Sequence, residues 1–479
     1  MAKYQVASNE WKSPACASIA LCVLLLVTHI SAFADGRSVA PRRPPASDGI
    51  SRRWLYDSWT GQWKPVGPSS PMGGPHAAYA GAAGYHSPIS TAPSWQLNPV
   101  IAWNTVRDEF LVVWEDARNG NGMDIYGQRM DAEGALLGEN LGIVVDEQDQ
   151  RAPILFYKSM DGEYLLLWHH RQRYAYEIRG QRLSAVGTPL GLPFRVSAFE
   201  GGTQWIPGAA YNDVHNEFLV AWEDTSTSEI VAQRISGDGD LLGLPISIAN
   251  WLEAQWTPPL VTFSNVQQEY LVVWDALVLG DVYSQFVAAD GSLRGESIVV
   301  SAAAGRQFVS DVLYCPASDE YLAVWTDERA VAKRGSDVYS QRIAANGTLV
   351  GEELLISEAP QWQRDARVAY DRIHEEYLVV WWDGRNAELA SDIYAQRMSP
   401  HGFLLGPNTP VSASTAEQVF PQLAARGTNG QFAIVWQEWH YEDREEGDSD
   451  VCGIIYAPPH FFIWIPWLVQ GSLSVHSPT

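Results

Sequence analysis

A short apolar stretch ending in tryptophan returns seven times along the chain, beginning with Glu109–Asp116. Its tryptophans are Trp114, Trp168, Trp222, Trp274, Trp325, Trp381 and Trp436, separated by 54, 54, 52, 51, 56 and 55 residues. A fixed period of this size is typical of propellers, solenoids and other repeat arrays. We therefore expect one repeated architecture over most of the 479 residues.

Each copy of this stretch has the pattern of a β-strand buried on both faces. Its apolar residues include aromatic and, in most copies, β-branched side chains, and they lack the spacing of three and four residues that marks a helix. Alternate residues of a strand point to opposite faces, which places Phe110 and Trp114 on one face and Val113 on the other. Because both faces are apolar, neighbouring sheets must cover both. We interpret the seven tryptophans as the structural core between those sheets.

Each repeat divides into four strands. In the first repeat these are Pro99–Trp103, the tryptophan strand, Asp124–Arg129 and Gly142–Val145. Glycine-containing turns such as Asp131–Gly134 separate the third strand from the fourth. Four antiparallel strands in each of seven repeats predict an all-β fold, a seven-bladed β-propeller over residues 86–459.

The seventh repeat lacks its fourth strand, and a segment near the N-terminus matches what is missing. His86–Ser90 has the same place ahead of a first strand that Leu244–Ser247 has in the third repeat. An open ring would leave two sheet faces exposed and a strand edge unpaired. We expect His86–Ser90 to complete the last sheet and close the ring.

The ends of the chain have a different character. Lys3 and Lys12 precede the apolar run Ala15–Val27, and Ala32-Phe33-Ala34 has the pattern of a cleavage site, so residues 1–34 are interpreted as a signal peptide. Residues 35–85 are rich in Pro, Gly and Arg and predict a linker. Within it, Trp54, Tyr56, Trp59 and Trp63 either dock as an extra strand on the outside of the domain or lack fixed structure. The apolar tail, residues 460–479, is too short to span a membrane and either packs on the ring or attaches to a partner.

Composition excludes one class of partner and fixes the expected state of the cysteines. The formal net charge of −24 argues against nucleic acid, because phosphate binding needs clustered Lys and Arg. Only Cys315 and Cys452 remain after signal cleavage, in repeats that are not neighbours, so we expect two free buried thiols. No spacing suggests a zinc site.

The order of motifs within a repeat resembles a known group of proteins. Glu376–Asp383 ends in Trp-x-Asp, and Asp392–Arg397 reads Asp-Ile-Tyr-x-Gln-Arg. This order resembles repeats of secreted bacterial β-propeller proteins and, more distantly, the WD40-like repeat of the TolB type. The resemblance covers Tyr85–Pro459 and implies the fold, while propellers as a class host many unrelated functions.

Acidic and amide side chains gather where the second strand ends and the third begins. Asp116, Asn119, Asn121 and Asp124 form the densest local group, and Ca²⁺ prefers several oxygen ligands of this kind. Calcium is the one cofactor that the sequence raises. The alternative is that these side chains accept backbone N–H bonds and hold their loops in place.

Two further sets of residues map to the same face. Glutamines precede the first strands, and their amides either bind sugar hydroxyls or bond to loop backbone: Gln96, Gln150, Gln204, Gln307, Gln363 and Gln418. Aromatic residues outside the repeat pattern are Trp95, Trp205, Trp251, Trp256, Trp362, Trp382, Trp439 and Tyr174. Exposed aromatic residues mark binding surfaces, although long loops also pack on themselves. The neighbouring His169 and His170 are a weak metal candidate, because adjacent strand residues point apart.

Arginines recur in the third strand and predict a structural pair. They are Arg129, Arg182, Arg234, Arg342 and Arg397, and the fourth repeat has Phe286 instead. We expect each guanidinium to pair with an acid of its own or the next repeat while its stem packs on an aromatic ring.

No catalytic motif stands out, and no residue is assigned a catalytic role. Gly-x-Ser-x-Gly, His-Glu-x-x-His and phosphate-loop patterns are absent. The first hypothesis is a secreted, monomeric, non-catalytic propeller, extracellular or at the cell surface, whose loop face binds a polysaccharide or a surface protein. The alternatives are a carbohydrate-active enzyme with acids at the mouth of the central channel, and a structural protein of cell-surface assembly.

Overall fold

The computed structural model of the chain describes residues 86–172, 175–197, 203–204, 206–250, 257–276, 280–386, 390–412, 414–440 and 448–458, and two strands near the N-terminus. The predicted signal peptide, most of the predicted linker and the predicted apolar tail lie outside these residues. Within the described part of the chain, no helix has the length and hydropathy of a membrane span.

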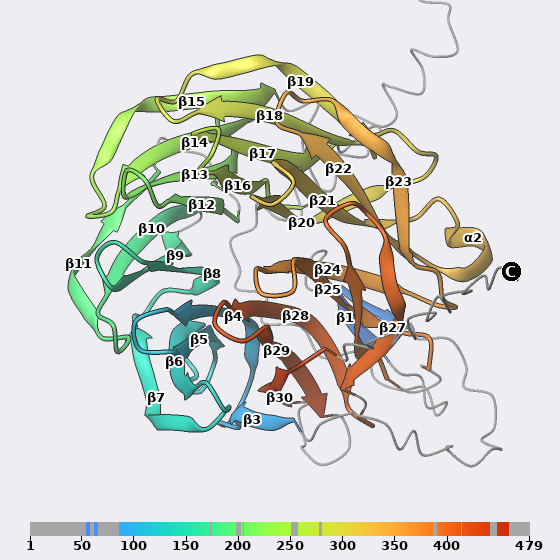
Figure 1. The fold of residues 1–479 in the computed structure, drawn as a ribbon. Helices are drawn as coiled ribbons and strands as arrows, with labels where there is room; N and C mark the ends of the chain where they lie inside the picture. Colours follow the sequence, from blue (N-terminus) through green and yellow to red (C-terminus); the bar gives the residue numbers. More distant parts are fainter. Residues whose placement is uncertain are drawn as a thin grey trace, which may run out of the picture.

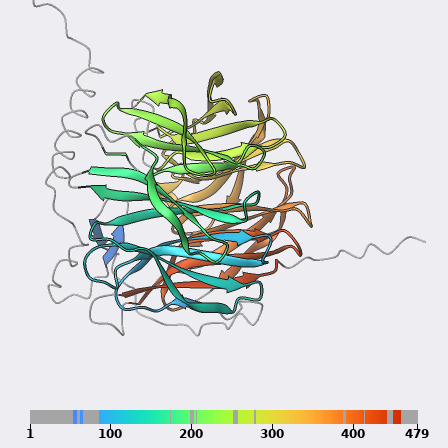
Figure 2. The ribbon, with the colours of Figure 1, turned by 90° about the vertical axis from the view of Figure 1, so that its left-hand side faces the viewer.

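Seven antiparallel sheets of four strands stand around a common axis and close into a disc (Figure 1). Seen from the side, the sheets lie face against face around the ring (Figure 2). We number these blades 1 to 7 in the order of their tryptophans. The predicted all-β, seven-bladed propeller is confirmed.

In blades 1 to 6 the strands follow chain order from the innermost to the outermost (Figure 1). Blades 1 to 3 consist of β4 (Gln96–Asn104), β5 (Glu109–Asp116), β6 (Asp124–Asp131), β7 (Leu136–Val144), β8 (Gln150–Lys158), β9 (Glu163–Gln172), β10 (Ala175–Leu183), β11 (Pro189–Arg195), β12 (Gly208–Asn212), β13 (Glu217–Asp224), β14 (Glu229–Ser236) and β15 (Leu241–Asn250). Blades 4 to 6 consist of β16 (Leu260–Ser264), β17 (Glu269–Asp275), β18 (Val282–Ala288), β19 (Leu293–Ser301), β20 (Gln307–Cys315), β21 (Glu320–Asp327), β22 (Asp337–Ala344), β23 (Leu349–Ser357), β24 (Gln363–Asp371), β25 (Glu376–Asp383), β26 (Asp392–Met398) and β27 (Leu404–Ser412). A one-turn helix, α2 (Val331–Arg334), lies between β21 and β22.

The core lies between neighbouring blades. All seven repeated tryptophans are at most 2% exposed, and each hydrophobic cluster combines strands of adjacent blades. One cluster joins Ala221 of blade 3 to Trp274 of blade 4, for example. The seven tryptophans therefore lie buried between the blades.

The N-terminal segment closes the ring. Blade 7 consists of β28 (Glu417–Arg426), β29 (Gln431–His440) and β30 (Asp448–Tyr456), and its outermost strand is β3 (Ser87–Ser90). β3 runs antiparallel to β30, with Pro88 opposite Cys452. Ile89 then packs in one cluster with Trp114 of blade 1 and Val435 of blade 7. The predicted closure by His86–Ser90 is confirmed, and a strand edge that would otherwise be open is paired.

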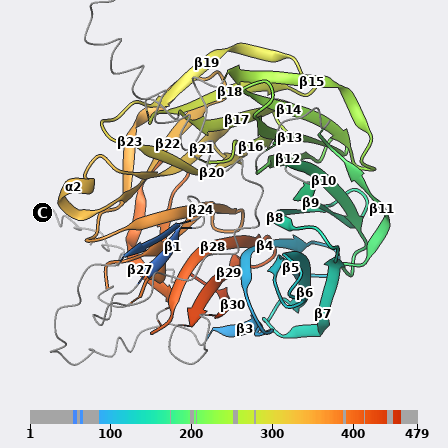
Figure 3. The same ribbon diagram turned by 180° about the vertical axis from the view of Figure 1, so that it is seen from behind.

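Two strands from the predicted linker form a hairpin of their own. β1 (Trp54–Asp57) pairs antiparallel with β2 (Gln62–Pro65), and neither belongs to one of the seven sheets. The hairpin lies at one face of the disc, drawn in blue in Figure 3. Both strands therefore pair with each other and do not extend a propeller sheet.

Arginine–glutamate pairs lie where the tryptophan strands begin. Arg129 lies 2.7 Å from Glu109, and the other four predicted arginines form the same pair: Arg182–Glu163, Arg234–Glu217, Arg342–Glu320 and Arg397–Glu376. In blade 4, Arg294 of the fourth strand reaches Glu269 at 2.6 Å and stacks on Phe286. Blade 4 therefore keeps an arginine–glutamate pair, although its arginine comes from the fourth strand and not from the third.

Candidate functional site

One face of the disc carries the ends of the second strands together with the starts of the first and third. In blade 1, Gln96 is opposite Asp116, which in turn is opposite Asp124. The same register holds in blades 5 and 6. We call this face the loop face; the described residues predicted to form the site lie on it.

Three of the four calcium candidates are bonded to protein groups that hold their loop. The Trp114 Nε1–H donates to Asp116 at 2.8 Å, and the Arg118 guanidinium lies 2.6 Å from the same carboxylate. The Asn119 amide donates to Asp124 at 2.7 Å. These contacts favour the loop-holding alternative raised by the sequence over a calcium site at this position.

The Trp–Asp–Arg contact is a repeated loop clamp. In blade 5, Trp325 donates to Asp327 at 2.9 Å, and Arg329 lies 2.7 Å from that carboxylate. Blade 6 repeats the arrangement with Trp381, Asp383 and Arg385. Each guanidinium also covers a tyrosine ring of the third strand: Tyr126, Tyr339 or Tyr394. The aspartate two residues after the tryptophan therefore has a structural role in these three blades.

The repeated glutamines are buried within their own loops. Gln96, Gln150, Gln204, Gln307, Gln363 and Gln418 are at most 1% exposed. The Gln96 amide donates to the Ser94 carbonyl at 2.9 Å, and the Gln307 amide donates to the Gly305 carbonyl at 3.1 Å. Gln363 bonds in the same way to the carbonyls of Pro360 and Gln361. The backbone-bonding alternative accounts for these three side chains. Gln204 and Gln418 instead donate to carboxylates, those of Asp224 and Glu438.

The non-repeated aromatic residues are spread over several blades. Trp362 is 36% exposed and is covered on one side by Arg364, whereas the Trp382 Nε1–H donates to Asp365 at 2.6 Å. Trp439 is half-buried in β29. Trp205, Trp251, Trp256 and Tyr174 lie outside the described residues.

The two neighbouring histidines serve the packing of blade 2. His169 is 3% exposed, stacks on Tyr176 and bonds to the carbonyl of Gln204. Burial lowers the pKa of His169 to about 4. His170 bonds to the Gln150 side chain at 2.9 Å. Their separate partners agree with the expectation that adjacent strand residues point apart.

A cavity of about 370 Å³ opens on the loop face between blades 1 and 2. It brings together two residues singled out from the sequence, Trp95 and Asn121, and four charged residues that were not singled out. The charged residues are Glu147, Asp149, Arg151 and Arg171. Two acids and two arginines balance one another, so the cavity presents both hydrogen-bond donors and acceptors without a dominant sign of charge.

The cavity has a braced wall. Asp149 accepts the backbone N–H of Met123 at 3.1 Å and pairs with Arg171 at 3.1 Å. Arg151 lies 3.6 Å from Glu115 of blade 1. Gly122 has a φ of 137°, and a Cβ there would lie 2.6 Å from a carboxylate oxygen of Asp149. Glycine is therefore required for the loop to approach this carboxylate.

The sequence did carry a signal for this cavity. The residue just before the repeated glutamine varies among the six blades that carry it, and only tryptophan occurs twice: Trp95, Asp149, Thr203, Arg306, Trp362 and Glu417. Of these, only the tryptophans are predicted site residues, because an isolated charged residue in a loop is common on any surface. Variation beside a repeated glutamine is the pattern that points to Asp149.

A second location on the same face has unusual electrostatics. Glu223 of blade 3 follows Trp222 as Glu115 follows Trp114 in blade 1. Glu115 accepts hydrogen bonds from Asn98 and from the backbone of Ala152. Glu223 forms no hydrogen bond or ion pair with any described residue. Burial and the nearby Asp275 carboxylate raise the pKa of Glu223 to about 7, so a carboxylic acid persists there near neutral pH.

Comparisons with known proteins add the following. No protein-family model matches the chain, and no curated protein matches it. Among solved structures, it is similar to hydrazine synthase of Kuenenia stuttgartiensis, with 11% identity and a TM-score of 0.49 over 72% of this chain and 94% of that one. A Dyadobacter fermentans protein of unknown function shows 10% identity and a TM-score of 0.48, covering 77% and 97%. The endo-arabinase of Bacteroides thetaiotaomicron shows 10% identity and a TM-score of 0.35, covering 53% and 95%. Similarities at this level assign no activity to the chain.

Proposed function

We propose that this protein is a secreted, non-catalytic propeller that binds a polysaccharide through the cavity between blades 1 and 2. The observation that carries this proposal is the cavity itself, with Trp95 and balanced donors and acceptors on a braced wall. Its volume of about 370 Å³ is within the range of roughly 300–1,000 Å³ that is usual for small-ligand sites. Secretion is part of the proposal and rests on the N-terminal sequence.

The chemistry of the lining fits sugars. Sugar rings offer an apolar face that can stack on an aromatic ring such as Trp95, together with hydroxyl groups that both donate and accept. Asn121, Asp149 and Arg171 supply both kinds of partner at the cavity wall. A surface protein is the other ligand class considered from the sequence, and a cavity of this size would take one side chain or loop tip of such a partner.

The experiment is a glycan-array screen of the mature protein, followed by titration calorimetry with the strongest glycan. Trp95→Ala and Asn121→Ala are expected to weaken binding at least tenfold, which corresponds to about 1.4 kcal/mol. Trp362→Ala is the matched control, because Trp362 also precedes the repeated glutamine but lies in blade 6. Equal loss in Trp95→Ala and Trp362→Ala, with unchanged melting of both, would contradict the assignment of the cavity.

A second candidate function rests on Glu223. A carboxylic acid that stays protonated near neutral pH can donate a proton to the oxygen of a leaving group, as a glycosidase acid does. Asp275 is fully buried, so its effect would be on the pKa of Glu223 and not on a substrate. Release of reducing ends by the wild type and its loss in Glu223→Gln would support a carbohydrate-active enzyme. Binding without turnover would favour the first proposal.

A further inference from the structure

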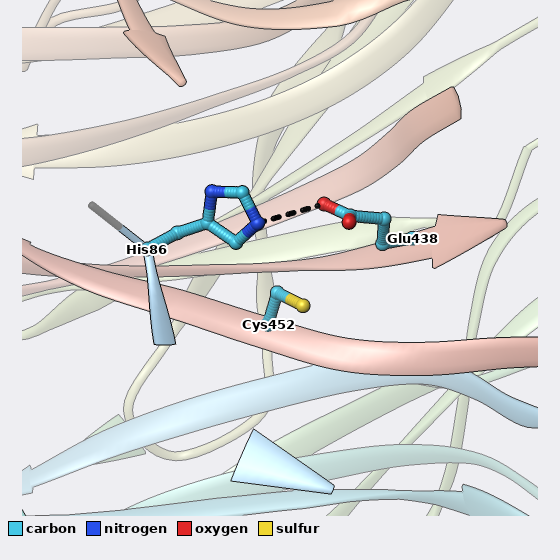
Figure 4. Close-up of side chains that lie close together, drawn as sticks. All are labelled: His86, Glu438 and Cys452. Carbon is cyan, nitrogen blue, oxygen red and sulfur yellow. Dashed lines mark ion pairs between the residues drawn. The ribbon is translucent and has the colours of Figure 1, made fainter. Parts of the chain in front are cut away.

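Three potential metal ligands meet where the ring closes. They are His86, next to the closing strand β3, Glu438 on β29 and Cys452 on β30 (Figure 4). One ligand atom from each residue lies within 4.8 Å of the other two. Glu438 and Cys452 are 4% and 3% exposed, and His86 is the more open of the three.

The register of blade 7 explains why these side chains converge. Asp450 is opposite Glu438 and Cys452 is opposite Trp436, so Glu438 and Cys452 are diagonal neighbours on one face of the sheet. Pro88 of β3 pairs with Cys452, and this pairing brings His86 to the same face. The cluster therefore exists only when the N-terminal segment is in place.

In other blades, the carboxylate that corresponds to Glu438 has a cationic partner. In blades 1, 5 and 6 the carboxylate beside the tryptophan indole is neutralised by an arginine: Arg118, Arg329 or Arg385. In blade 7 the corresponding residue is His440, which pairs with Asp450 at 3.1 Å. Among the described residues, the one cationic partner of Glu438 is His86, at 3.3 Å. The place of the guanidinium is taken here by the imidazole of His86, and the thiol of Cys452 lies beside it.

We propose that His86, Glu438 and Cys452 bind a divalent transition-metal ion, with Zn²⁺ as the best fit, and that the ion fastens the closing strand to blade 7. An imidazole nitrogen, a carboxylate oxygen and a thiolate sulfur are the ligand types that Zn²⁺ accepts. Zn²⁺ with one carboxylate and one thiolate is electrically neutral, which suits a buried place. Binding displaces the proton of the thiol and any proton on the Nε2 atom of His86.

The surroundings already orient two of the ligands. The Ser412 hydroxyl lies 3.2 Å from the Nδ1 atom of His86, which leaves Nε2 directed toward Glu438. The Gln418 amide donates to Glu438 at 2.9 Å, and the Trp436 indole donates to it at 3.3 Å. Hydrogen bonds of this kind fix the orientation of metal ligands and tune their affinity. Three protein ligands leave a fourth tetrahedral position for water, consistent with the partial exposure of His86.

The test uses the full chain without a histidine tag, stripped with a chelator and titrated with Co²⁺ and Zn²⁺. We expect one Co²⁺ per chain with the near-ultraviolet absorption of a thiolate–Co²⁺ bond, and a melting temperature that rises with free Zn²⁺. Cys452→Ser should lose the absorption. Cys315→Ser should keep it, because Cys315 is the other buried free thiol among the described residues and belongs to blade 5.

Two results would overturn the proposal. One is wild-type protein that gives no thiolate–Co²⁺ absorption and no Zn²⁺-dependent shift in melting temperature. That result is expected if His86 and Glu438 form an ion pair only and the Cys452 thiol binds no metal. The other is absorption that persists in Cys452→Ser. If Cys452→Ser fails to fold, His86→Gln takes its place, and the wild-type spectrum and stoichiometry still decide the question.

Discussion

Replacing Trp325 tests the packing between blades in energetic terms. Trp325 is 0% exposed, stacks on Tyr339 and donates its indole N–H to Asp327 at 2.9 Å. A buried tryptophan removes about 150–250 Å² from water, worth about 4–6 kcal/mol at about 25 cal/mol per Å². Alanine keeps part of that contact, so we expect Trp325→Ala to lower the free energy of unfolding by about 3–5 kcal/mol.

A comparison of two blades separates the indole hydrogen bond from the apolar contact. The Nε1 of Trp222 in blade 3 has no hydrogen-bond partner among the described residues. Trp325→Phe and Trp222→Phe remove similar apolar volume, but only the first removes a donor from a buried carboxylate. Trp325→Phe should therefore cost about 1–3 kcal/mol more than Trp222→Phe.

Urea denaturation followed by far-ultraviolet circular dichroism measures these differences. The control is Trp362→Ala, whose side chain is 36% exposed and should change stability little. A Trp325→Ala protein as stable as Trp362→Ala would refute the burial of the repeated tryptophans. Equal costs for the two phenylalanine variants would refute the role given to the indole–carboxylate bond.

Three further predictions concern other parts of the ring. Gly208→Ala should destabilise the protein by about 1–3 kcal/mol or more in the same denaturation assay, because a Cβ there would lie 1.8 Å from the carbonyl oxygen of Pro259 in the next blade. Arg294→Ala should cost about 1–2 kcal/mol in the same assay by removing the cation that pairs with Glu269. The added substitution Phe286→Arg restores the arrangement of the other blades and should recover part of the loss; no recovery would argue against the exchange. Glu223→Gln should raise the melting temperature at pH 8 more than at pH 5. A carboxyl group whose pKa in the folded protein is raised to about 7 costs stability as pH rises from about 4.5 through 7, and glutamine removes that cost. An equal effect at both pH values would contradict the raised pKa.

The fold followed from the sequence because its signals repeat. Seven tryptophan strands of one period require seven alike sheets, and the missing strand of blade 7 pointed to His86–Ser90. The outer strands were harder to place: β7 begins at Leu136, ahead of the predicted Gly142. Its outer edge is exposed, so the apolar alternation that marks a strand is weak there.

The candidate sites were less predictable because they combine residues that are distant in sequence. The cavity joins Trp95 to Arg171, and the cluster at the closure joins His86 to Cys452, so no local motif shows either one. The sequence shows part of the loop clamp: Trp-x-Asp recurs in several repeats, but nothing in the pattern marks Arg118, two residues beyond Asp116. Its role depends on folding back over Tyr126, which a spacing rule does not reveal.

Hydrogen exchange with and without the best glycan of the array tests the proposed binding site most directly. We expect slower exchange in the two loops that line the cavity, residues 117–123 and 147–151, and no change in the loops of blades 5 and 6. Slower exchange confined to the surroundings of Glu223, or no change with any glycan that the protein retains, would contradict it.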